Sequence, residues 1–246
     1  SAQSWQELRA GTSQQPATHS SGIPELSYQS TEVADFAAYA FMAWMGVCGF
    51  LLFRWCRDYV QFVIHENSSE CDCDEWNIEW DSVKTESQVS ARIPLHVSQN
   101  IGPLLCRMPS GYRVIVPYKL WKSVTASQRR LMLRHELAHF QRGDIWWSLV
   151  AHLAAIPHWF NPLAWYTVRR LEQGLEWACD DKTRAFGEQR QTEYASTLLA
   201  IGEFGSASIP RCATAINGSQ LGGRINRLLS NSATQEKSSS RMLVFS

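Results

Sequence analysis

The feature that most constrains this chain is an uncharged run of 18 residues from Phe36 to Phe53. A helix needs about 17–25 apolar residues to cross the hydrocarbon core of a bilayer, so this run is long enough to span one. Trp55 and Tyr59 follow it, where interfacial aromatic side chains are common. The small residues in the run leave a buried core helix open as an alternative, but we favour a transmembrane helix over residues 31–57.

The charged residues on the two sides of this run differ in sign. Glu32 and Asp35 precede the run, whereas Arg54 and Arg57 follow it. No Lys or Arg occurs between Arg9 and Arg54. The acidic flank and the late start argue against a signal peptide. Because basic residues collect on the cytoplasmic side of a membrane, the chain after the run is predicted to be cytoplasmic.

The composition indicates a folded domain with appendages. The chain has 246 residues, of which 45% are hydrophobic, and this suffices for a core. Its 23 basic residues balance its 23 acidic ones, so no direct binding of nucleic acid is expected. The seven cysteines are odd in number and scattered, which favours a reducing compartment. The chain begins with Ser1 rather than Met, so we take it for an excerpt or a processed product.

A second informative pattern is H-E-x-x-H at residues 135–139. Histidines at i and i+4 share one helix face, so His135 and His139 can both reach one Zn²⁺. Glu136 can reach a metal-bound water as general base, and such a water has a pKa of about 7. The alternative is a solvated helix with two unpaired histidines, which the apolar neighbours of the motif disfavour.

Local signals place both histidines in the middle of a helix. Thr125, followed three residues later by Gln128, forms a capping-box pattern at its start. Gly143 directly after Arg142 predicts its end. Helix geometry therefore enforces the spacing of the two histidines.

A later helix is expected to supply the third ligand. Asn161-Pro162 predicts a helix start, and the helical pattern runs to Gly187. Within it, Glu176 and Asp180 are four residues apart and share a face. One carboxylate can ligate zinc while the other accepts the free N–H of a ligating histidine, as such carboxylates usually do.

Three segments carry a resemblance to a known family. They are the H-E-x-x-H run with Arg142 and Asp144 after it, the element Phe160-Asn161-Pro162-Leu163, and Glu176-x-x-Cys179-Asp180. Together they resemble the integral-membrane peptidases of the beta-lactam-sensor antirepressor (BlaR/MecR) type. The resemblance covers roughly residues 90–230 and is specific over 135–181.

This resemblance implies a glutamate-zincin with His135, His139 and Glu176 as zinc ligands and Glu136 as catalytic base. It also implies that Asp180 orients His135. The implied activity is cleavage of a protein, either the chain itself or a regulatory protein such as a transcriptional repressor, at the cytosolic face of a bacterial inner membrane. The alternative is a catalytically silent membrane signalling or scaffold protein, but the intact set of residues favours the enzyme.

The expected partners are therefore a protein substrate and membrane lipid. The chain contains no S-x-x-K motif of a serine-nucleophile sensor. Any sensor domain is accordingly expected outside this chain.

We therefore predict an α+β fold, with a zincin-like metallopeptidase domain over residues 91–230 attached to at least one transmembrane helix. Residues 1–30 indicate a flexible extracytoplasmic segment and residues 58–90 a polar acidic linker. Residues 231–246 indicate a polar tail that leads into an apolar segment cut short. Strands of a small sheet are predicted at 92–97, 104–108 and 112–116.

Two further clusters leave alternatives open. Cys71 and Cys73 near His65 are candidate ligands of a second metal, but a C-x-C without a matching pair lacks the usual zinc spacing, and we prefer a solvated linker. Residues 145–160 are too apolar for an exposed helix and indicate a core or membrane-surface helix. Its histidines, His152 and His158, are interpreted as packing or interfacial residues, although either could serve as an electrophile for the oxyanion.

Overall fold

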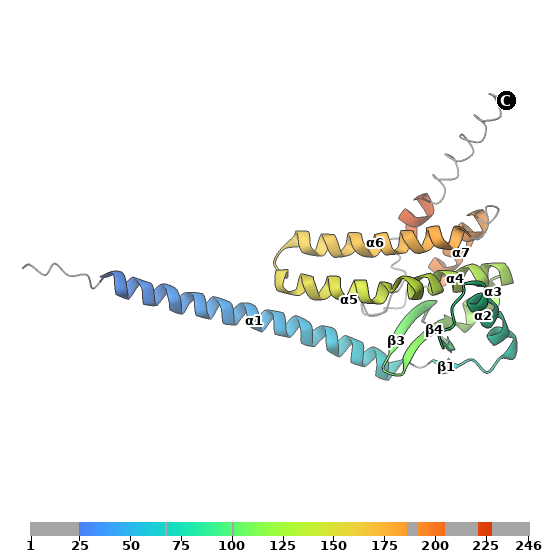
Figure 1. Cartoon of the computed structure of the whole chain (residues 1–246), viewed down its shortest axis with the longest axis horizontal. Coiled ribbons are helices and arrows are strands. Elements are labelled where there is room, and N and C mark those ends of the chain that lie inside the picture. The colour runs from blue at the N-terminus through green and yellow to red at the C-terminus, as the bar shows by residue number, and fades with distance from the viewer. Residues whose placement is uncertain (1–24, 67, 100, 186–190, 205–220, 228–246) are drawn as a thin grey trace, which may run out of the picture. The chain divides into compact units, whose positions relative to one another are not determined.

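The computed structural model describes residues 25–66, 68–99, 101–185, 191–204 and 221–227 (Figure 1). The chain divides into two compact units, Ser1–Val47 and Cys48–Ser246. The described residues of the first unit all belong to helix α1. The predicted tail at 231–246, and the predicted flexible segment up to residue 24, lie outside the described residues.

Helix α1 (Glu25–His65) contains the uncharged run and is longer than the predicted 31–57. By length and composition, its segment Glu32–His65 is able to cross a membrane. The helix continues beyond residue 57 because Phe62 is buried against the sheet. Packing therefore extends the helix into residues that the sequence analysis assigns to a linker.

A small mixed sheet is formed by β1 (Ser69–Glu70), β2 (Leu95–Ser98), β3 (Leu104–Met108) and β4 (Gly111–Pro117). Its strand order is β1-β2-β4-β3, in which β2 and β4 are parallel and the other two pairs are antiparallel. The three predicted strands are confirmed, but the first starts later because Pro94 offers no N–H to a ladder. Gly111, with φ of 126°, allows the tight turn between β3 and β4.

The two faces of the sheet are covered differently. Leu104, Cys106 and Ile115 pack with Phe62 from the end of α1. The opposite face contributes Leu105 and other residues to the main core, which includes side chains of the following helices. The members of this main core include Trp76, Trp80, Leu105, Val114, Val116, Trp121, Met132 and Leu137.

Helix α2 (Asp74–Glu86) lies within the residues predicted to be an acidic linker. That interpretation does not hold here, because Trp76, Trp80 and Val83 recur on one helix face and are buried in the main core. The acidic residues of the segment lie between these apolar positions and obscure their spacing. Among the described residues, Cys71, Cys73 and His65 do not come together as a metal-binding group.

Helix α3 (Tyr118–Ser123) leads into α4 (Ala126–Arg142), which carries the H-E-x-x-H pattern. The predicted capping box is confirmed, since the Thr125 side chain accepts from the Gln128 N–H and the Gln128 side chain accepts from the Thr125 N–H. Gly143 ends the helix in the left-handed region with φ of 68°.

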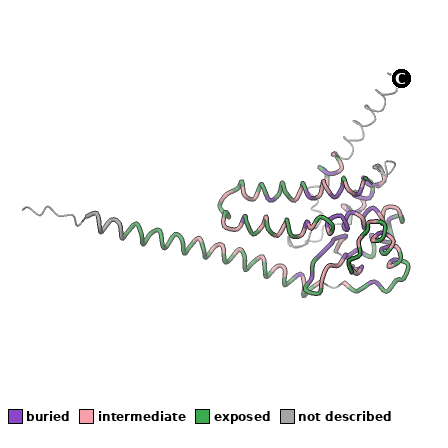
Figure 2. The backbone as a smooth tube through the Cα atoms, in the orientation of Figure 1, coloured by how far each residue is buried: buried purple, intermediate pink, exposed green. Residues whose placement is uncertain are grey.

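Helices α5 (Asp144–Ala155) and α6 (Pro162–Arg184) run side by side and are joined through the 3-10 turn η2 (Ile156–His158) (Figure 1). The core alternative for residues 145–160 is wrong, because only Ala155 among them is buried. The expected helix end at Gly187 lies outside the described residues. Figure 2 shows that the turn end of this hairpin is mostly exposed.

Helix α7 (Gln191–Phe204) and a helical segment over residues 221–227 complete the described fold. Tyr194 and Leu198 of α7 pack against Leu131 of α4, with Leu221 and Ile225 beside them. These contacts bring the last described part of the chain to the helix that carries the histidines. The fold is α+β, mostly helical with a small mixed sheet, as predicted.

Candidate metal centre

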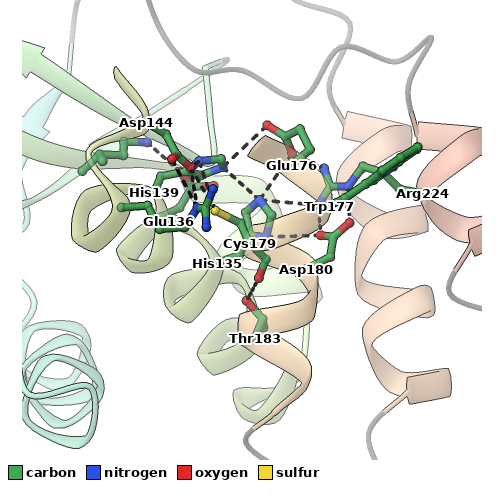
Figure 3. Close-up of polar contacts among 12 residues, drawn as sticks. His135, Glu136, His139, Asp144, Glu176, Trp177, Cys179, Asp180, Thr183 and Arg224 are labelled. Atoms are coloured by element: carbon green, nitrogen blue, oxygen red, sulfur yellow. Dashed lines mark hydrogen bonds and ion pairs between the residues drawn. The ribbon is translucent and has the colours of Figure 1, made fainter. Parts of the chain in front are cut away.

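The two histidines of α4 face each other in a buried position. His135 and His139 are each 3% exposed, and their Nε2 atoms are 3.1 Å apart (Figure 3). The spacing of four residues along α4 brings the rings together. Two nitrogens bound tetrahedrally to one zinc, at about 2.0–2.1 Å each, would stand at nearly this separation.

Helix α6 brings a carboxylate to the same point. Glu176 Oε2 lies 3.5 Å from His135 Nε2, and Glu176 Oε1 lies 3.6 Å from His139 Nε2. Among the described residues, these three side chains form a group whose ligand atoms all lie within 4.8 Å of one another. The structure therefore brings together the three residues that the sequence analysis predicts as ligands.

Asp144 determines which ring nitrogen of His139 carries a proton. Its Oδ2 lies 2.8 Å from His139 Nδ1, and the residue is fully buried. A carboxylate only accepts hydrogen bonds, so Nδ1 must donate, and Nε2 is the ring nitrogen left for a metal. That is the tautomer a metal at Nε2 requires.

Tyr194 has the corresponding effect on His135. Its hydroxyl donates to Asp180 Oδ1 at 2.7 Å and lies 2.9 Å from His135 Nδ1. Because the phenol proton is already committed to Asp180, Nδ1 of His135 must donate to the phenol oxygen. Nε2 is therefore the ring nitrogen of His135 that is left for a metal.

Asp180 lies farther from His135 than the hydroxyl of Tyr194 does. Its Oδ1 is 3.4 Å from His135 Nδ1, beyond ordinary hydrogen-bond length. The direct contact implied by the family resemblance is thus replaced by a relay through Tyr194. The reason is packing, since α7 inserts its buried tyrosine next to both residues.

Arg224 closes the site from the segment over residues 221–227. Its guanidinium donates to both oxygens of Asp180, at 2.9 and 2.5 Å, and lies 2.8 Å from Glu176 Oε2. The side chain is 1% exposed. Burial alone would lower the pKa of Arg224, but the charges of Glu176 and Asp180 raise it above its ordinary value. Arg224 therefore remains a cation.

The buried charges around this site are mostly negative. Glu136, Asp144 and Asp180, which are buried, and Glu176, whose side chain is 12% exposed, supply four carboxyl groups, whereas Arg224 is the one Lys or Arg that is buried among the described residues. Burial raises the pKa of Glu176, but the hydrogen bond to His135 and the charges of His139 and Arg224 reverse this and lower it. Unpaired buried charge is costly, so a cation would be stabilised here.

These observations make a divalent metal a good fit to the residues present. The two Nε2 atoms face each other at 3.1 Å, with a carboxylate beside them and an excess of negative charge around them. Two histidines and one carboxylate with a remaining open position are the ligand set of a catalytic zinc site.

Glu136 lies next to this group without belonging to it. Its Oε2 accepts a hydrogen bond of 2.7 Å from the Leu105 N–H of β3. Burial raises the pKa of Glu136, and the charges of His135 and His139 partly offset that effect. A carboxylate with a raised pKa, held from the backbone, is suited to accept a proton at its other oxygen.

Cys179 forms a second cluster with His139 and Asp144. Burial raises the pKa of its thiol to about 11, so the sulfur stays protonated near neutral pH. The thiol donates to Asp144 Oδ2 at 3.2 Å. We therefore interpret Cys179 as a neighbour that supports Asp144, since only a thiolate ligates zinc.

His152 and His158 do not join the site. Their Nδ1 atoms contact the carbonyl oxygens of Ser148 and Ala154 within the hairpin, at 2.9 and 3.2 Å. Neither belongs to a metal-binding group among the described residues. The packing or interfacial interpretation agrees with these positions.

Asp144, Tyr194 and Arg224 are the site residues that sequence reasoning missed as partners of the histidines. Tyr194 lies 59 residues from His135, and Arg224 lies 89 residues from it. No motif spacing connects such distant residues. Asp144 had a local signal, because it follows the left-handed Gly143 that ends the histidine helix.

We expect Asp180→Ala to weaken metal binding or activity by about 10–100-fold, which is the usual cost of losing a carboxylate behind a ligating histidine. Asp181→Ala is the matched control, because Asp181 is 47% exposed and pairs with Arg227 on the outer side of α6. Zinc affinity measured by competition with a chelating dye separates the two. A damaging Asp181→Ala with a silent Asp180→Ala would contradict this assignment.

Comparison with known proteins adds two findings. The sequence model of a family described as BlaR1 peptidase M56 matches residues 2–228. The chain is also similar to the Regulatory protein BlaR1 of Bacillus licheniformis, with 34% identity over 121 residues. That alignment covers 42% of this chain and 20% of the relative, so the chain spans a minor part of that protein's length.

Proposed function

This chain belongs to the BlaR1 peptidase M56 family, and from that premise we propose that it is a membrane-bound zinc endopeptidase. In this proposal His135, His139 and Glu176 hold the zinc, and Glu136 is the catalytic base. The observation that carries it is the pair of facing Nε2 atoms, with the Nδ1 atom of each ring engaged by a hydrogen bond to another residue.

The proposed roles follow from the contacts of each side chain. When bound, zinc would polarise a peptide carbonyl and acidify a water. Glu136 Oε2 is held by the Leu105 N–H, so we assign proton transfer to Oε1. Asp144 and Tyr194 hold the two imidazoles in the tautomer that leaves Nε2 free.

The proposed substrate is a protein, either this chain itself or a regulatory protein such as a transcriptional repressor. The name of the relative, a regulatory protein, supports a role in signalling. Cleavage at the cytosolic face is proposed from Arg54 and Arg57, which follow the apolar run of α1. The sensor of the signal is proposed to lie outside this chain.

The runner-up is a membrane signalling or scaffold protein that keeps the fold without turnover. Glu136 is retained together with all three proposed ligands, and this favours the enzyme, because loss of the base is the simplest route to a silent site. The two functions differ in one measurable property: only the enzyme cleaves protein in a zinc-dependent manner.

The test of the proposed function is metal content combined with proteolysis. Purified in detergent, the chain is expected to contain about one zinc per molecule and to cleave itself or the unfolded probe β-casein. Removal of zinc with 1,10-phenanthroline should stop cleavage, and added zinc should restore it. Bound zinc without any cleavage of either probe would favour the scaffold.

We expect His139→Ala to lose the metal, because it removes one of three ligands and leaves Asp144 without its partner. Zinc content measured by mass spectrometry should fall from about one per chain to near zero. His158→Ala is the control, since His158 lies on the exposed end of the hairpin and its ring contacts the Ala154 carbonyl oxygen. Equal zinc in the two variants would overturn the ligand assignment.

The orientation of α1 gives a separate prediction. A reporter fused after residue 60 is expected to be cytoplasmic, and one fused before residue 30 extracytoplasmic, because the basic flank follows the apolar run. Paired alkaline phosphatase and fluorescent protein fusions measure this directly. The reverse pattern would place the metal centre outside the cytoplasm.

A further inference from the structure

The free end of the α5–α6 hairpin exposes an unusual amount of apolar surface. Trp159 is 38% exposed, Phe160 63% and Leu163 65%. Trp147, Val150 and Leu153 continue this exposed apolar surface along α5. Contiguous exposed apolar surface of this kind marks a place where something other than water covers the protein.

Charge is absent from the same segment. Residues 145–168 contain no Asp, Glu, Lys or Arg. The carboxylate of Glu172 is directed to the hairpin itself, 3.5 Å from His152. A water-exposed hairpin normally carries charged side chains, whereas ionisable residues within lipid-facing elements are rare and paired.

The turn at the end of the hairpin satisfies its own backbone. The Asn161 N–H donates to His158 O at 2.8 Å, and the Asn161 side chain accepts from the Leu163 N–H at 2.9 Å. The Trp165 indole N–H donates to Trp159 O at 3.0 Å. Internal satisfaction of backbone groups is the requirement for any segment that enters hydrocarbon.

The contact between α1 and the hairpin indicates what covers this surface. Cys48 Sγ lies 3.8 Å from Ile156 O at the hairpin turn. Cys48 belongs to the uncharged run of α1 and precedes Arg54 by six residues, or about 9 Å along a helix. The hairpin turn therefore lies about 9 Å beyond the level of Arg54, beside the part of α1 that is suited to hydrocarbon.

Helix α6 gives nearly the same distance between the hairpin turn and the first basic residues. It begins at Pro162, and its first basic residues are Arg169 and Arg170. Seven residues of helix correspond to about 10 Å. The basic residues of α1 and of α6 thus lie at nearly the same distance from the hairpin turn, as they would if both marked one membrane surface.

Aromatic and basic side chains lie together at the base of α5. The Trp146 indole N–H donates to the Tyr112 hydroxyl at 3.0 Å, and the Arg107 guanidinium lies 5.3 Å from the Trp146 ring centre. Tryptophan, tyrosine and arginine gathered at one level are typical of the interface between lipid and water. Trp146 precedes Ile156 of the turn by ten residues, or about 15 Å along a helix, so it lies on the aqueous side of the level of Arg54.

We propose that the turn end of the α5–α6 hairpin inserts about 10 Å into the lipid hydrocarbon of the leaflet marked by Arg54, as a re-entrant element beside α1. Helix α5 has 12 residues and is too short to span a bilayer, so the hairpin enters and leaves on one side. The occupant of its apolar surface is lipid acyl chain.

This insertion also sets the distance of the metal centre from the membrane. Glu176 follows Arg169 by seven residues of α6, so it lies about 10 Å on the aqueous side of the same surface. A peptide bond that reaches the site must therefore approach the bilayer closely. This consequence rests on the proposed function, whereas the insertion itself does not.

The insertion is tested by photolabelling of the whole wild-type chain in vesicles of phosphatidylcholine and phosphatidylglycerol. One phosphatidylcholine probe carries a diazirine in the acyl chain and another carries it at the headgroup. Tandem mass spectrometry then locates lipid adducts on the protein. The control is Ile78, which is 69% exposed and apolar but lies on α2.

The acyl-chain probe is expected to label residues 159–163 as strongly as residues 48–53 of α1, and to leave Ile78 at background. The headgroup probe is expected to label Trp146 and Trp147 instead. Labelling of residues 159–163 at the level of Ile78 would overturn the proposal. The Glu136→Gln protein should label identically, so the result does not depend on proteolysis.

Discussion

Replacing Glu136 by Gln is expected to lower the rate of proteolysis by about 10²–10⁴-fold while leaving about one zinc per chain. The side chain is 3% exposed, and its Oε2 is held by the Leu105 N–H. Glutamine has the same shape and can still accept this hydrogen bond through its amide oxygen. It cannot accept the proton of a zinc-bound water, so the chemical step fails while the fold remains.

The measurement is the initial rate of β-casein cleavage and of self-cleavage, with zinc determined on the same sample. Glu75→Gln is the matched control, because it makes the same chemical change at an exposed position of α2. It should leave both the rate and the zinc unchanged. Metal loss in the Glu136→Gln protein would show that Glu136 is a ligand and would refute the assignment of roles.

Replacing Arg224 by Met is expected to lower the free energy of unfolding of the metal-free protein by about 3–5 kcal/mol, the usual cost of breaking a buried ion pair. Arg224 is 1% exposed and donates to both oxygens of Asp180. Methionine fills much of the same volume but leaves Asp180 as a buried carboxylate without its cation. Glu176 also loses its neighbouring positive charge.

The control for this change is Arg227→Met, three residues along the same helical segment. Arg227 pairs with Asp181, and these side chains are 30% and 47% exposed, so the loss should be about 0–1 kcal/mol. Urea unfolding in detergent with a chelator, followed by tryptophan fluorescence, compares the two. If the two variants lost equal free energy of unfolding, the buried ion pair of Arg224 would contribute no more than the exposed pair of Arg227, and the prediction would be refuted.

The part of the site on α4 could be predicted because every signal for it is local. The capping box at Thr125, the apolar positions of the helix and the end at Gly143 all lie within one element. A helix then places residues i and i+4 on one face whatever surrounds it. The spacing of Glu176 and Asp180 on α6 follows from the same rule.

The rest of the site depends on contacts between distant elements. The sequence analysis expects Asp180 to contact His135 directly, whereas α7 brings Tyr194 to hydrogen-bonding distance of both. Arg224 reaches Asp180 from a segment 44 residues farther along the chain. No periodicity encodes such pairings, because they arise from how helices pack.

The helix over residues 74–86 is a part of the fold that the sequence alone did not predict. Its acidic composition suggests a solvated linker, yet Trp76, Trp80 and Val83 are buried in the main core. Composition averages over the helix, whereas burial selects one face of it. Only the presence of the sheet and of α4 determines that this face has a partner.

The sequence by itself determined the membrane-length helix, the paired histidines and the carboxylate helix, because chain connectivity and helix geometry act over a few residues. The tertiary structure decided which groups hold the imidazoles and which cation neutralises Asp180. It also decided that the α5–α6 hairpin keeps its apolar end uncovered by the described protein. These outcomes depend on contacts across the fold, where the free energy of burial, rather than local spacing, selects the partners.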